Sequence, residues 1–250
     1  MTVVELVELR LDEEEYERAL AVLSEEEWTR VREMRSERKR RRFVAARAAV
    51  RTRLARELGI AAERVVVRVG EWGKPELGRV DEENKPQLGR ASATKARSLP
   101  RFSVSHSDDL AAIAIRRGGE VGVDVERVRG ERRADGRRVD WERLLARICG
   151  EREREQAGED AERLGARMAF HTRWVAKEAV VKALGCGFRV APAEVTLCRK
   201  AGALEMVGLY GRKEGSAQCT LVPFEAPLGF VGALALADGP YVDPGNLLAG

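Results

Sequence analysis

Polar and apolar residues alternate without a break in residues 120–126, which read EVGVDVE. A period of two predicts a β-strand with one buried face and one polar face. The three valines would form the buried face, and Gly122, Asp124 and Glu126 would form the polar one. The two carboxylates lie about 6–7 Å apart along such a strand, and glycine leaves room for a ligand beside the backbone. The carboxylates could therefore bind one cation together, or form only an exposed polar edge.

Helical spacing marks residues 174–182, which read WVAKEAVVK. At 100° per residue, Glu178 and Lys182 are one turn apart on one face, whereas Lys177 lies about 100° from Glu178. The opposite side is apolar and should be buried; it consists of Ala176, Ala179, Val180, Ala183 and Leu184. Glu178 and Lys182 could belong to a functional site, or form an ordinary surface ion pair worth about 0.2–0.5 kcal/mol.

Two shorter motifs could bind an anion. Residues 101–107, RFSVSHS, end a predicted strand with a serine on each side of His106, and such a row can donate hydrogen bonds to phosphate oxygens. The G-x-S-x-G motif of serine hydrolases is absent, so neither serine is a candidate nucleophile. Residues 72–75, WGKP, predict a turn that presents Lys74. Each motif also has a purely structural explanation, as a local serine–histidine contact or as an ordinary turn.

Charge is distributed unevenly along the 250 residues, although the net charge is only +4. Residues 1–28 carry ten acidic and two basic side chains, and residues 29–58 carry twelve basic and three acidic ones. The basic block could be a solvated helix face, or a surface for nucleic acid or a phosphorylated small molecule. An aromatic content of 5% argues against single-strand binding by base stacking.

The wider pattern combines helices with many short strands. The expected helices are 24–58 with a break near Ser36 and a cap at Gly59, 140–149, and 159–184 with a break near Arg173. The expected strands are 3–9, 65–69, 102–104, 110–115, 121–126, 194–197, 203–209, 218–222 and 230–237. We predict an α+β fold with mainly antiparallel sheets in two similar halves, 1–117 and 118–250. Residues 76–100, with an echo of KPELGR in KPQLGR, predict a surface loop.

Simple features argue against several other classes of protein. The longest apolar stretch, residues 230–237, is far shorter than the ~20 residues of a membrane span. The acidic N-terminus does not have the pattern of a secretory signal. The four cysteines form no CxxC pair, which argues against a zinc ribbon and against a disulfide framework. We therefore expect a cytoplasmic protein that does not bind membranes.

Taken in order, the motifs GKP, FSVSHS, GVDVE and WVAKEAVVKALG resemble the Sfp-type 4′-phosphopantetheinyl transferases. The resemblance covers nearly the whole chain from Leu23 onward, and its specific part is GVDVE followed about fifty residues later by WxxKExxxKA. It implies a fold of two α+β halves related by a pseudo-twofold axis, with coenzyme A and Mg²⁺ in the cleft between them. It also implies transfer of phosphopantetheine from coenzyme A to a serine of an apo acyl or peptidyl carrier protein, with release of 3′,5′-ADP.

The resemblance gives the motif residues their expected roles. Asp124, Glu126 and Glu178 would hold Mg²⁺, and Glu178 would also accept the serine proton. Lys182 would contact the pyrophosphate and offset the charge that develops on the leaving phosphate. The expected coenzyme A contacts are Lys74, Ser105 and His106 at the phosphates, and Arg30, Arg42 and Arg47 near the adenosine phosphate. The same comparison implies a monomer, because each half supplies one wall of a single cleft.

Some details depart from the family pattern. Ser103 stands where the family often has asparagine, and residues 75–101 are longer than usual, so either Lys74 or Lys85 could be the contacting lysine. Cys149-Gly150 replaces a common Phe-Ser, and Glu153 matches an acidic position whose role is open. The carrier could belong to polyketide, nonribosomal peptide, fatty-acid or siderophore synthesis.

Two other functions fit single features of the sequence. A nucleic-acid-binding module could use residues 29–58, but no helix-turn-helix, zinc-finger or RNP pattern accompanies them. A Mg²⁺-dependent nuclease could use the carboxylates, but the usual (Asp/Glu)-x-Lys strand element is absent because Glu126 follows Asp124 at that spacing. We therefore expect no nucleic-acid partner.

Overall fold

A computed structural model describes residues 2–70, 72–78, 99–200, 203–209 and 219–239. Lys85 and most of the expected loop 76–100 lie outside these residues. The chain divides into two compact units. Unit 1 comprises Met1–Gly70 and Pro75–Gly118, and unit 2 comprises Glu71–Lys74 and Gly119–Gly250. The pseudo-twofold relation between the halves stays a prediction.

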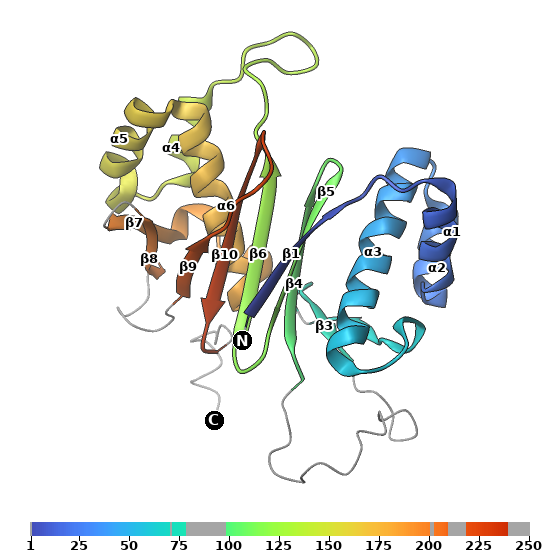
Figure 1. The fold of residues 1–250 in the computed structure, drawn as a ribbon. Helices are drawn as coiled ribbons and strands as arrows, with labels where there is room; N and C mark the ends of the chain where they lie inside the picture. The colour runs from blue at the N-terminus through green and yellow to red at the C-terminus, as the bar shows by residue number, and fades with distance from the viewer. Residues whose placement is uncertain (1, 71, 79–98, 201–202, 210–218, 240–250) are drawn as a thin grey trace. The chain divides into compact units, whose positions relative to one another are not determined.

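Unit 1 is built on a three-stranded antiparallel sheet with the order β1-β5-β4. Its strands are β1 (Thr2–Glu8), β4 (Arg101–Ser107) and β5 (Leu110–Arg116). The long helix α3 (Glu37–Leu58) packs on one face of this sheet, where Val50 and Leu54 meet Phe102 and Ile113. Figure 1 shows α3 along the sheet. A short antiparallel pair, β2 (Val67–Val69) and β3 (Pro75–Leu77), completes the unit.

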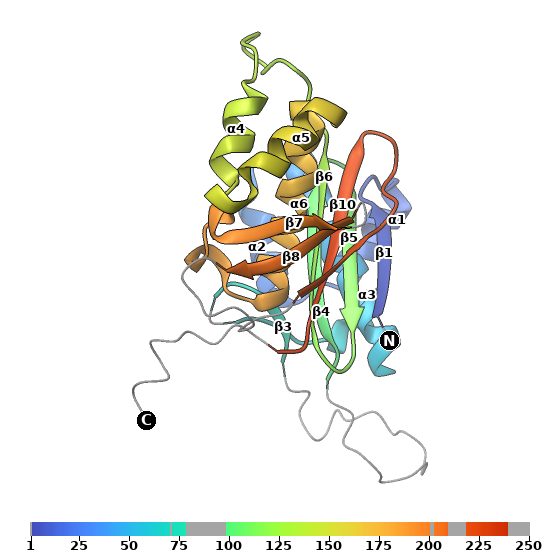
Figure 2. The same cartoon turned by 90° about the vertical axis from the view of Figure 1, so that its left-hand side faces the viewer.

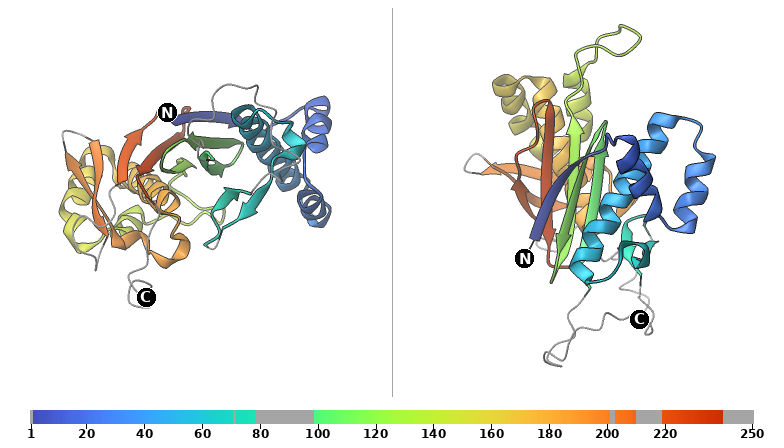
Figure 3. Two further views of the ribbon diagram at one scale, coloured as in Figure 1. Left: turned by 90° about the horizontal axis from the view of Figure 1, so that it is seen from below. Right: turned by 45° about the vertical axis from the view of Figure 1, so that its right-hand side comes forward.

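Two short helices pack on the side of α3 that faces away from the sheet (Figure 3, right). They are α1 (Glu13–Ala21) and α2 (Glu25–Glu33). Each begins with a capping box, because the side chains of Asp12 and Ser24 accept the backbone N–H groups of Glu15 and Glu27. The box at Ser24 was expected, whereas α1 was not.

Unit 2 repeats the theme of one sheet and one long helix. Its sheet has the order β6-β10-β9 and is antiparallel, with β6 (Glu120–Arg127), β9 (Cys219–Pro223) and β10 (Phe230–Ala237). Helix α6 (Ala166–Leu184) packs on it through an apolar core that includes Ala179 and Val180. Helices α4 (Trp141–Ile148) and α5 (Arg154–Leu164) and the strand pair β7 (Val195–Lys200) and β8 (Ala203–Leu209) surround α6 (Figure 2).

The structure confirms the α+β class, since every described strand pair between named strands is antiparallel. It also confirms the break near Ser36 and the left-handed cap at Gly59. The expected break at Arg173 is wrong. The chain turns at Gly165, with φ 80°, and α6 runs through Arg173 without interruption.

No helix among the described residues is long and apolar enough to cross a membrane.

The strand expected at 65–69 is shorter than predicted, because a 3-10 turn (Ala62–Arg64) precedes it and the strand begins at Val67.

Candidate active site

Strand β6 and helix α6 approach each other most closely at Gly122. A Cβ atom on Gly122 would lie 2.0 Å from the carbonyl oxygen of Ala179 and 2.3 Å from the backbone nitrogen of Ala183. The expectation that glycine leaves room for a ligand is therefore wrong, because the backbone of α6 fills that space. The polar face of β6 is turned toward α6 as a result.

Asp124 is buried in this arrangement and is only 4% exposed. Its Oδ1 accepts a hydrogen bond from Nζ of Lys182 at 2.7 Å, and the two residues are 58 positions apart. The alternative of an exposed polar edge is therefore wrong for Asp124, and Lys182 does more than form a local surface pair with Glu178. The valines on the other face of β6 are fully buried, as predicted.

The pKa of Glu178 on α6 responds to the charges of Asp124 and Glu126 on β6. Burial raises the pKa of Glu178, the negative charges of Asp124 and Glu126 raise it further, and Lys182 opposes the rise. The apolar residues expected on the other side of α6 are buried, as predicted. The charges of Asp124 and Glu126 on β6 therefore act on Glu178 of α6, and Lys182 opposes them.

This donor set fits a hard divalent cation. Mg²⁺ prefers oxygen ligands and commonly combines a few carboxylates with phosphate oxygens and water. Besides burial, repulsion from Asp124 and Glu126 raises the pKa of Glu178, and a bound cation would relieve this repulsion. No group of three His, Cys, Asp or Glu side chains in the described part of the chain is already gathered as a ligand set. Asp124 is held by Lys182 instead.

A test of this electrostatic arrangement follows from the raised pKa of Glu178. The folded state disfavours the charged carboxylate, so the stabilising contribution of this group is present below its unfolded pKa of about 4.3 and is lost as pH rises through the folded value. Without metal or coenzyme A, Glu178→Gln should therefore raise the melting temperature at pH 7.5, and this gain should vanish near pH 4.

Thermal unfolding of both proteins across this pH range measures the effect. Glu162→Gln, which changes an exposed glutamate of α5, serves as the control and should show no such pH-dependent gain. A gain for Glu178→Gln that is the same at both pH values would contradict the raised pKa of Glu178.

A cavity of about 650 Å³ in unit 2 is lined in part by Glu126. Its walls are aromatic and its lining also contains arginines; the residues are Arg129, Arg132, Arg133, Trp141, Phe170, His171 and Trp174. The sequence reasoning did not single out His171. Its Nε2 accepts the backbone N–H of Arg129 at 3.2 Å and its Nδ1 lies 2.8 Å from the carbonyl oxygen of Arg167. Burial lowers the pKa of His171, which favours the neutral ring.

Unit 1 contains a second group of charges, on α2 and α3. The guanidinium groups of Arg30 and Arg47 both lie against the ring of Phe43, at 5.2 Å and 5.4 Å from its centre. Burial lowers the pKa of Arg47, Glu27 opposes this, and the charges of Arg30 and Arg51 add to it. Arg51 also pairs with Glu27, at 2.6 Å. Arg47 and Arg51 thus share the carboxylate of Glu27, and the charge of Arg30 acts on Arg47 as well. This excess of positive charge suits an anion.

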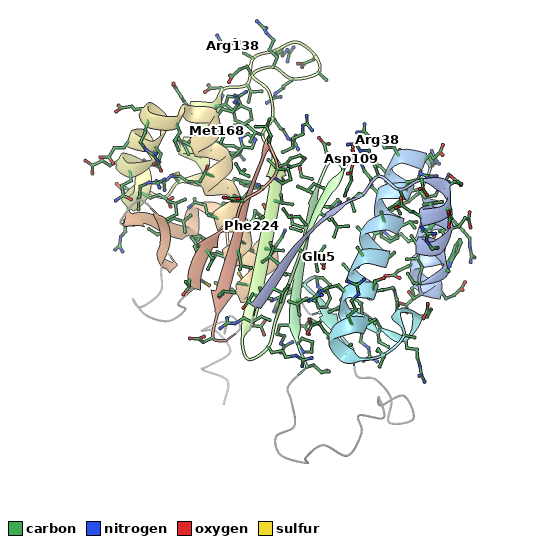
Figure 4. All side chains as sticks on the ribbon, in the orientation of Figure 1. Glu5, Arg38, Asp109, Arg138, Met168 and Phe224 are labelled. Atoms are coloured by element: carbon green, nitrogen blue, oxygen red, sulfur yellow. The ribbon has the colours of Figure 1, made fainter. Side chains whose placement is uncertain are left out.

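Arg42 belongs to a different group. Its Nε donates to Asp109 at 2.6 Å, and Asp109 also lies 3.7 Å from Arg38. Figure 4 labels Asp109 and Arg38 next to each other near the β4–β5 turn. Arg42 and Arg47 are five residues apart on α3 and point about 140° away from each other. The structure therefore brings Arg30 together with Arg47 but not with Arg42.

The motif RFSVSHS lies on β4, as predicted, but its donors do not form one row. Ser105 is 6% exposed whereas His106 is exposed, as expected for neighbours on a strand. His106 shares its face with Phe102 and Val104, which pack in the same core as α3 residues. Ser105 points to the opposite face.

Lys74 belongs to unit 2 and is held by two partners. Its Nζ lies 2.8 Å from Glu120 and 3.2 Å from the carbonyl oxygen of Ala183. It therefore ties the GKP segment to the start of β6 and the last turn of α6.

Strand β6 and helix α6 of unit 2 thus carry the carboxylates and the lysine that interact with one another. A family model described as "ACPS: 4′-phosphopantetheinyl transferase superfamily" matches residues 120–224, which include both β6 and α6. Over these residues, which are less than half of the chain, the protein is similar to the 4′-phosphopantetheinyl transferase superfamily.

Among solved structures, the holo-[acyl-carrier-protein] synthase of Thermotoga maritima matches with 24% sequence identity and a TM-score of 0.37. The match covers 48% of this chain and 63% of that chain, so it spans less than two thirds of the solved protein. A search of curated proteins finds no match.

Proposed function

We propose that this protein transfers 4′-phosphopantetheine from coenzyme A to a serine of an apo acyl or peptidyl carrier protein. One observation carries the proposal. The residues matched by the family model include buried Asp124, paired with Lys182, and Glu178, whose pKa is raised by burial and by the acidic groups of β6. The protein would act as a monomer, and Sfp-type membership, a cytoplasmic location and release of 3′,5′-ADP are parts of the same proposal.

In the proposed reaction, the serine oxygen forms a bond to the phosphorus nearer the pantetheine, and the bond from that phosphorus to the bridging oxygen breaks. Glu178 would accept the serine proton, because a carboxylate with a raised pKa is a better base near neutral pH. Lys182 would donate to the leaving phosphate from its position beside Asp124. Mg²⁺, held by Asp124, Glu126 and Glu178, would neutralise the pyrophosphate.

Other groups would bind the rest of coenzyme A. Arg30 and Arg47 are our candidates for the adenosine 3′-phosphate, because they share an excess of positive charge around Phe43. Ser105, His106 and Lys74 stay candidates for the remaining phosphates. The aromatic cavity beside Glu126 suits the uncharged pantetheine chain.

The direct test is incubation with coenzyme A, Mg²⁺ and a panel of apo carrier proteins, followed by intact-protein mass spectrometry. We expect a carrier to gain the mass of phosphopantetheine only when all components are present. A Mg²⁺ nuclease would instead cut added DNA, and a nucleic-acid-binding module would bind DNA but give neither product. If no carrier in the panel is modified, the proposed activity is wrong.

The role of Arg47 can be tested with a coenzyme that lacks the 3′-phosphate. Arg47→Ala should raise the KM for coenzyme A about tenfold or more, in line with the loss of a charge-assisted contact of about 1.5–3 kcal/mol. The KM for dephospho-coenzyme A should change little, because the contacted phosphate is missing from it. Steady-state kinetics with both substrates measures the difference.

Arg42→Ala is the matched comparison for Arg47→Ala, since both residues lie on α3 but Arg42 is held by Asp109. We expect it to affect the two coenzymes equally. If Arg42→Ala raised the KM for coenzyme A but not for dephospho-coenzyme A, and Arg47→Ala did not, Arg42 would be the residue that contacts the 3′-phosphate.

A further inference from the structure

Helix α6 carries two completely buried cations on a face that the proposed reaction does not use. Arg173 and Lys177 are one turn apart, and both are 0% exposed. Burying an ionic side chain is costly unless the charge is paired and its hydrogen bonds are made. The partners of these two residues therefore show which parts of the chain this face of α6 is bound to.

Lys177 has three acceptors for its three N–H groups. Its Nζ lies 2.7 Å from Oε2 of Glu153 and 2.9 Å from the carbonyl oxygen of Pro192, and it also donates to the carbonyl of Val195. Glu153 ends a 3-10 turn (Glu151–Glu153) and is itself 0% exposed. The ammonium group is thus fully satisfied. It cannot move without breaking contacts to two separate segments of the chain, at Glu153 and at residues 192–195.

Arg173 extends the same cluster to α5. Its Nη2 donates to Asp160 at 2.7 Å, and its Nη1 lies 3.1 Å from Oε1 of Glu153. Asp160 also accepts from Nε of Arg199 on β7 at 2.9 Å. Glu153 therefore bridges the two cations of α6, and the cluster ties this helix to the 3-10 turn, to α5 and to β7.

The cluster matters for the site because of its position around the helix. Lys177 is adjacent in sequence to Glu178, and Arg173 and Lys177 form a stripe about 140° around the helix from the stripe of Glu178 and Lys182. The contact of Gly122 with Ala179 and Ala183 is a third stripe. The contact at Gly122 sets how closely α6 approaches β6, and the buried ion pairs add a penalty for any movement that separates their charges.

The chemistry of the neighbourhood gives no sign that the cluster itself reacts. Burial raises the pKa of the nearby Cys149 thiol to about 11, with Glu153 contributing, so this thiol stays protonated near neutral pH. Every charged group of the cluster is already paired within it.

We propose that Glu153, Lys177 and Arg173 are positioning residues, which set the rotation of α6 and thereby aim Glu178 and Lys182 at Asp124. The catalytic use of Glu178 and Lys182 rests on the proposed function, whereas the positioning of α6 by the cluster does not. It assigns Glu153 a role, which its sequence position left open. It also separates Lys177 from the reacting groups, although the two neighbours Lys177 and Glu178 stand in one motif.

The test is the double variant Lys177→Met/Glu153→Gln, which removes one buried positive and one buried negative charge together. Neutral replacements of a buried ion pair are often close to neutral for stability, so we expect a folded protein with an unfolding midpoint near that of the wild type. We expect its Mn²⁺ affinity in the presence of coenzyme A, measured by electron paramagnetic resonance, to fall about 10–100-fold. We also expect kcat to fall by a similar factor with little change in the KM for the carrier.

The matched control is Arg53→Met/Glu57→Gln, which removes a half-buried ion pair of α3 in unit 1. It should leave Mn²⁺ affinity and kcat unchanged. If the first double variant does not fold, Glu153→Asp replaces it, because it keeps the charge and withdraws the carboxylate by one methylene. It should lower Mn²⁺ affinity in the same direction.

The outcomes separate this inference from the proposed function. A folded variant with wild-type Mn²⁺ affinity and kcat overturns the positioning role, as does a loss of activity that only follows the folded fraction. A wild-type protein that modifies no carrier overturns the proposed function, and the Mn²⁺ comparison still tests whether the cluster positions the carboxylates.

Discussion

Replacing Asp124 by asparagine is expected to lower kcat/KM for phosphopantetheine transfer by about 10²–10³-fold or more. The amide keeps the shape of the side chain and can still accept a hydrogen bond from Lys182. It removes the negative charge, however, and an amide is a poorer ligand for Mg²⁺ than a carboxylate. The measurement is the rate of mass gain on an apo carrier protein at saturating coenzyme A.

Stability has to be separated from chemistry in this experiment, because Asp124 is buried. Removing one partner of a buried ion pair costs about 3–5 kcal/mol. A second variant, Asp124→Asn/Lys182→Met, removes both charges of the pair. It should recover much of that stability but none of the activity. Asp140→Asn is the control, since it makes the same chemical change at the N-terminal cap of α4, where asparagine can still accept the N–H of Arg143. Wild-type turnover in folded Asp124→Asn would remove this carboxylate from the mechanism.

Replacing Gly122 by alanine should have the largest effect on stability. The added methyl group would meet the backbone of α6 at 2.0–2.3 Å, and a backbone cannot move aside as a flexible side chain can. We expect a loss of about 3 kcal/mol or more, at the upper end for overpacking. Transfer activity in the folded fraction should also fall, because α6 carries Glu178 and Lys182 away from Asp124.

Denaturant unfolding measures the first effect and single-turnover transfer the second. Gly158→Ala is the matched control, because this glycine of α5 has open space around its Cβ position. Alanine there should stabilise the helix by up to about 1 kcal/mol. A Gly122→Ala protein as stable and active as the wild type would show that the contact between β6 and α6 is not tight.

Local sequence patterns predicted many of the helices and strands. The alternation of residues 120–126 predicted β6 and its buried valines, and the spacing of residues 174–182 predicted the buried side of α6. The capping box at Ser24 and the glycine cap at Gly59 were found where the sequence indicated. The same rule, applied to Asp12, would have found the missed helix α1, because Glu15 completes a capping box there.

The helix break expected at Arg173 shows a limit of prediction from local sequence patterns. A charged residue within an apolar helical segment indicates an exposed position or an interruption when only its neighbours are considered. The structure buries Arg173 because Glu153 and Asp160, 20 and 13 residues away, supply its counter-charges. The chain turns at Gly165 instead, where φ is positive.

The sequence by itself determined the strand and the helix that carry the candidate site, because periodicity and capping depend on residues within one or two turns of each other. Only the tertiary structure decided that Lys182 pairs with Asp124, that Gly122 admits the backbone of α6, and that Arg47 rather than Arg42 joins Arg30. These contacts join residues far apart in the chain, and such pairings depend on packing and charge balance that no local period records.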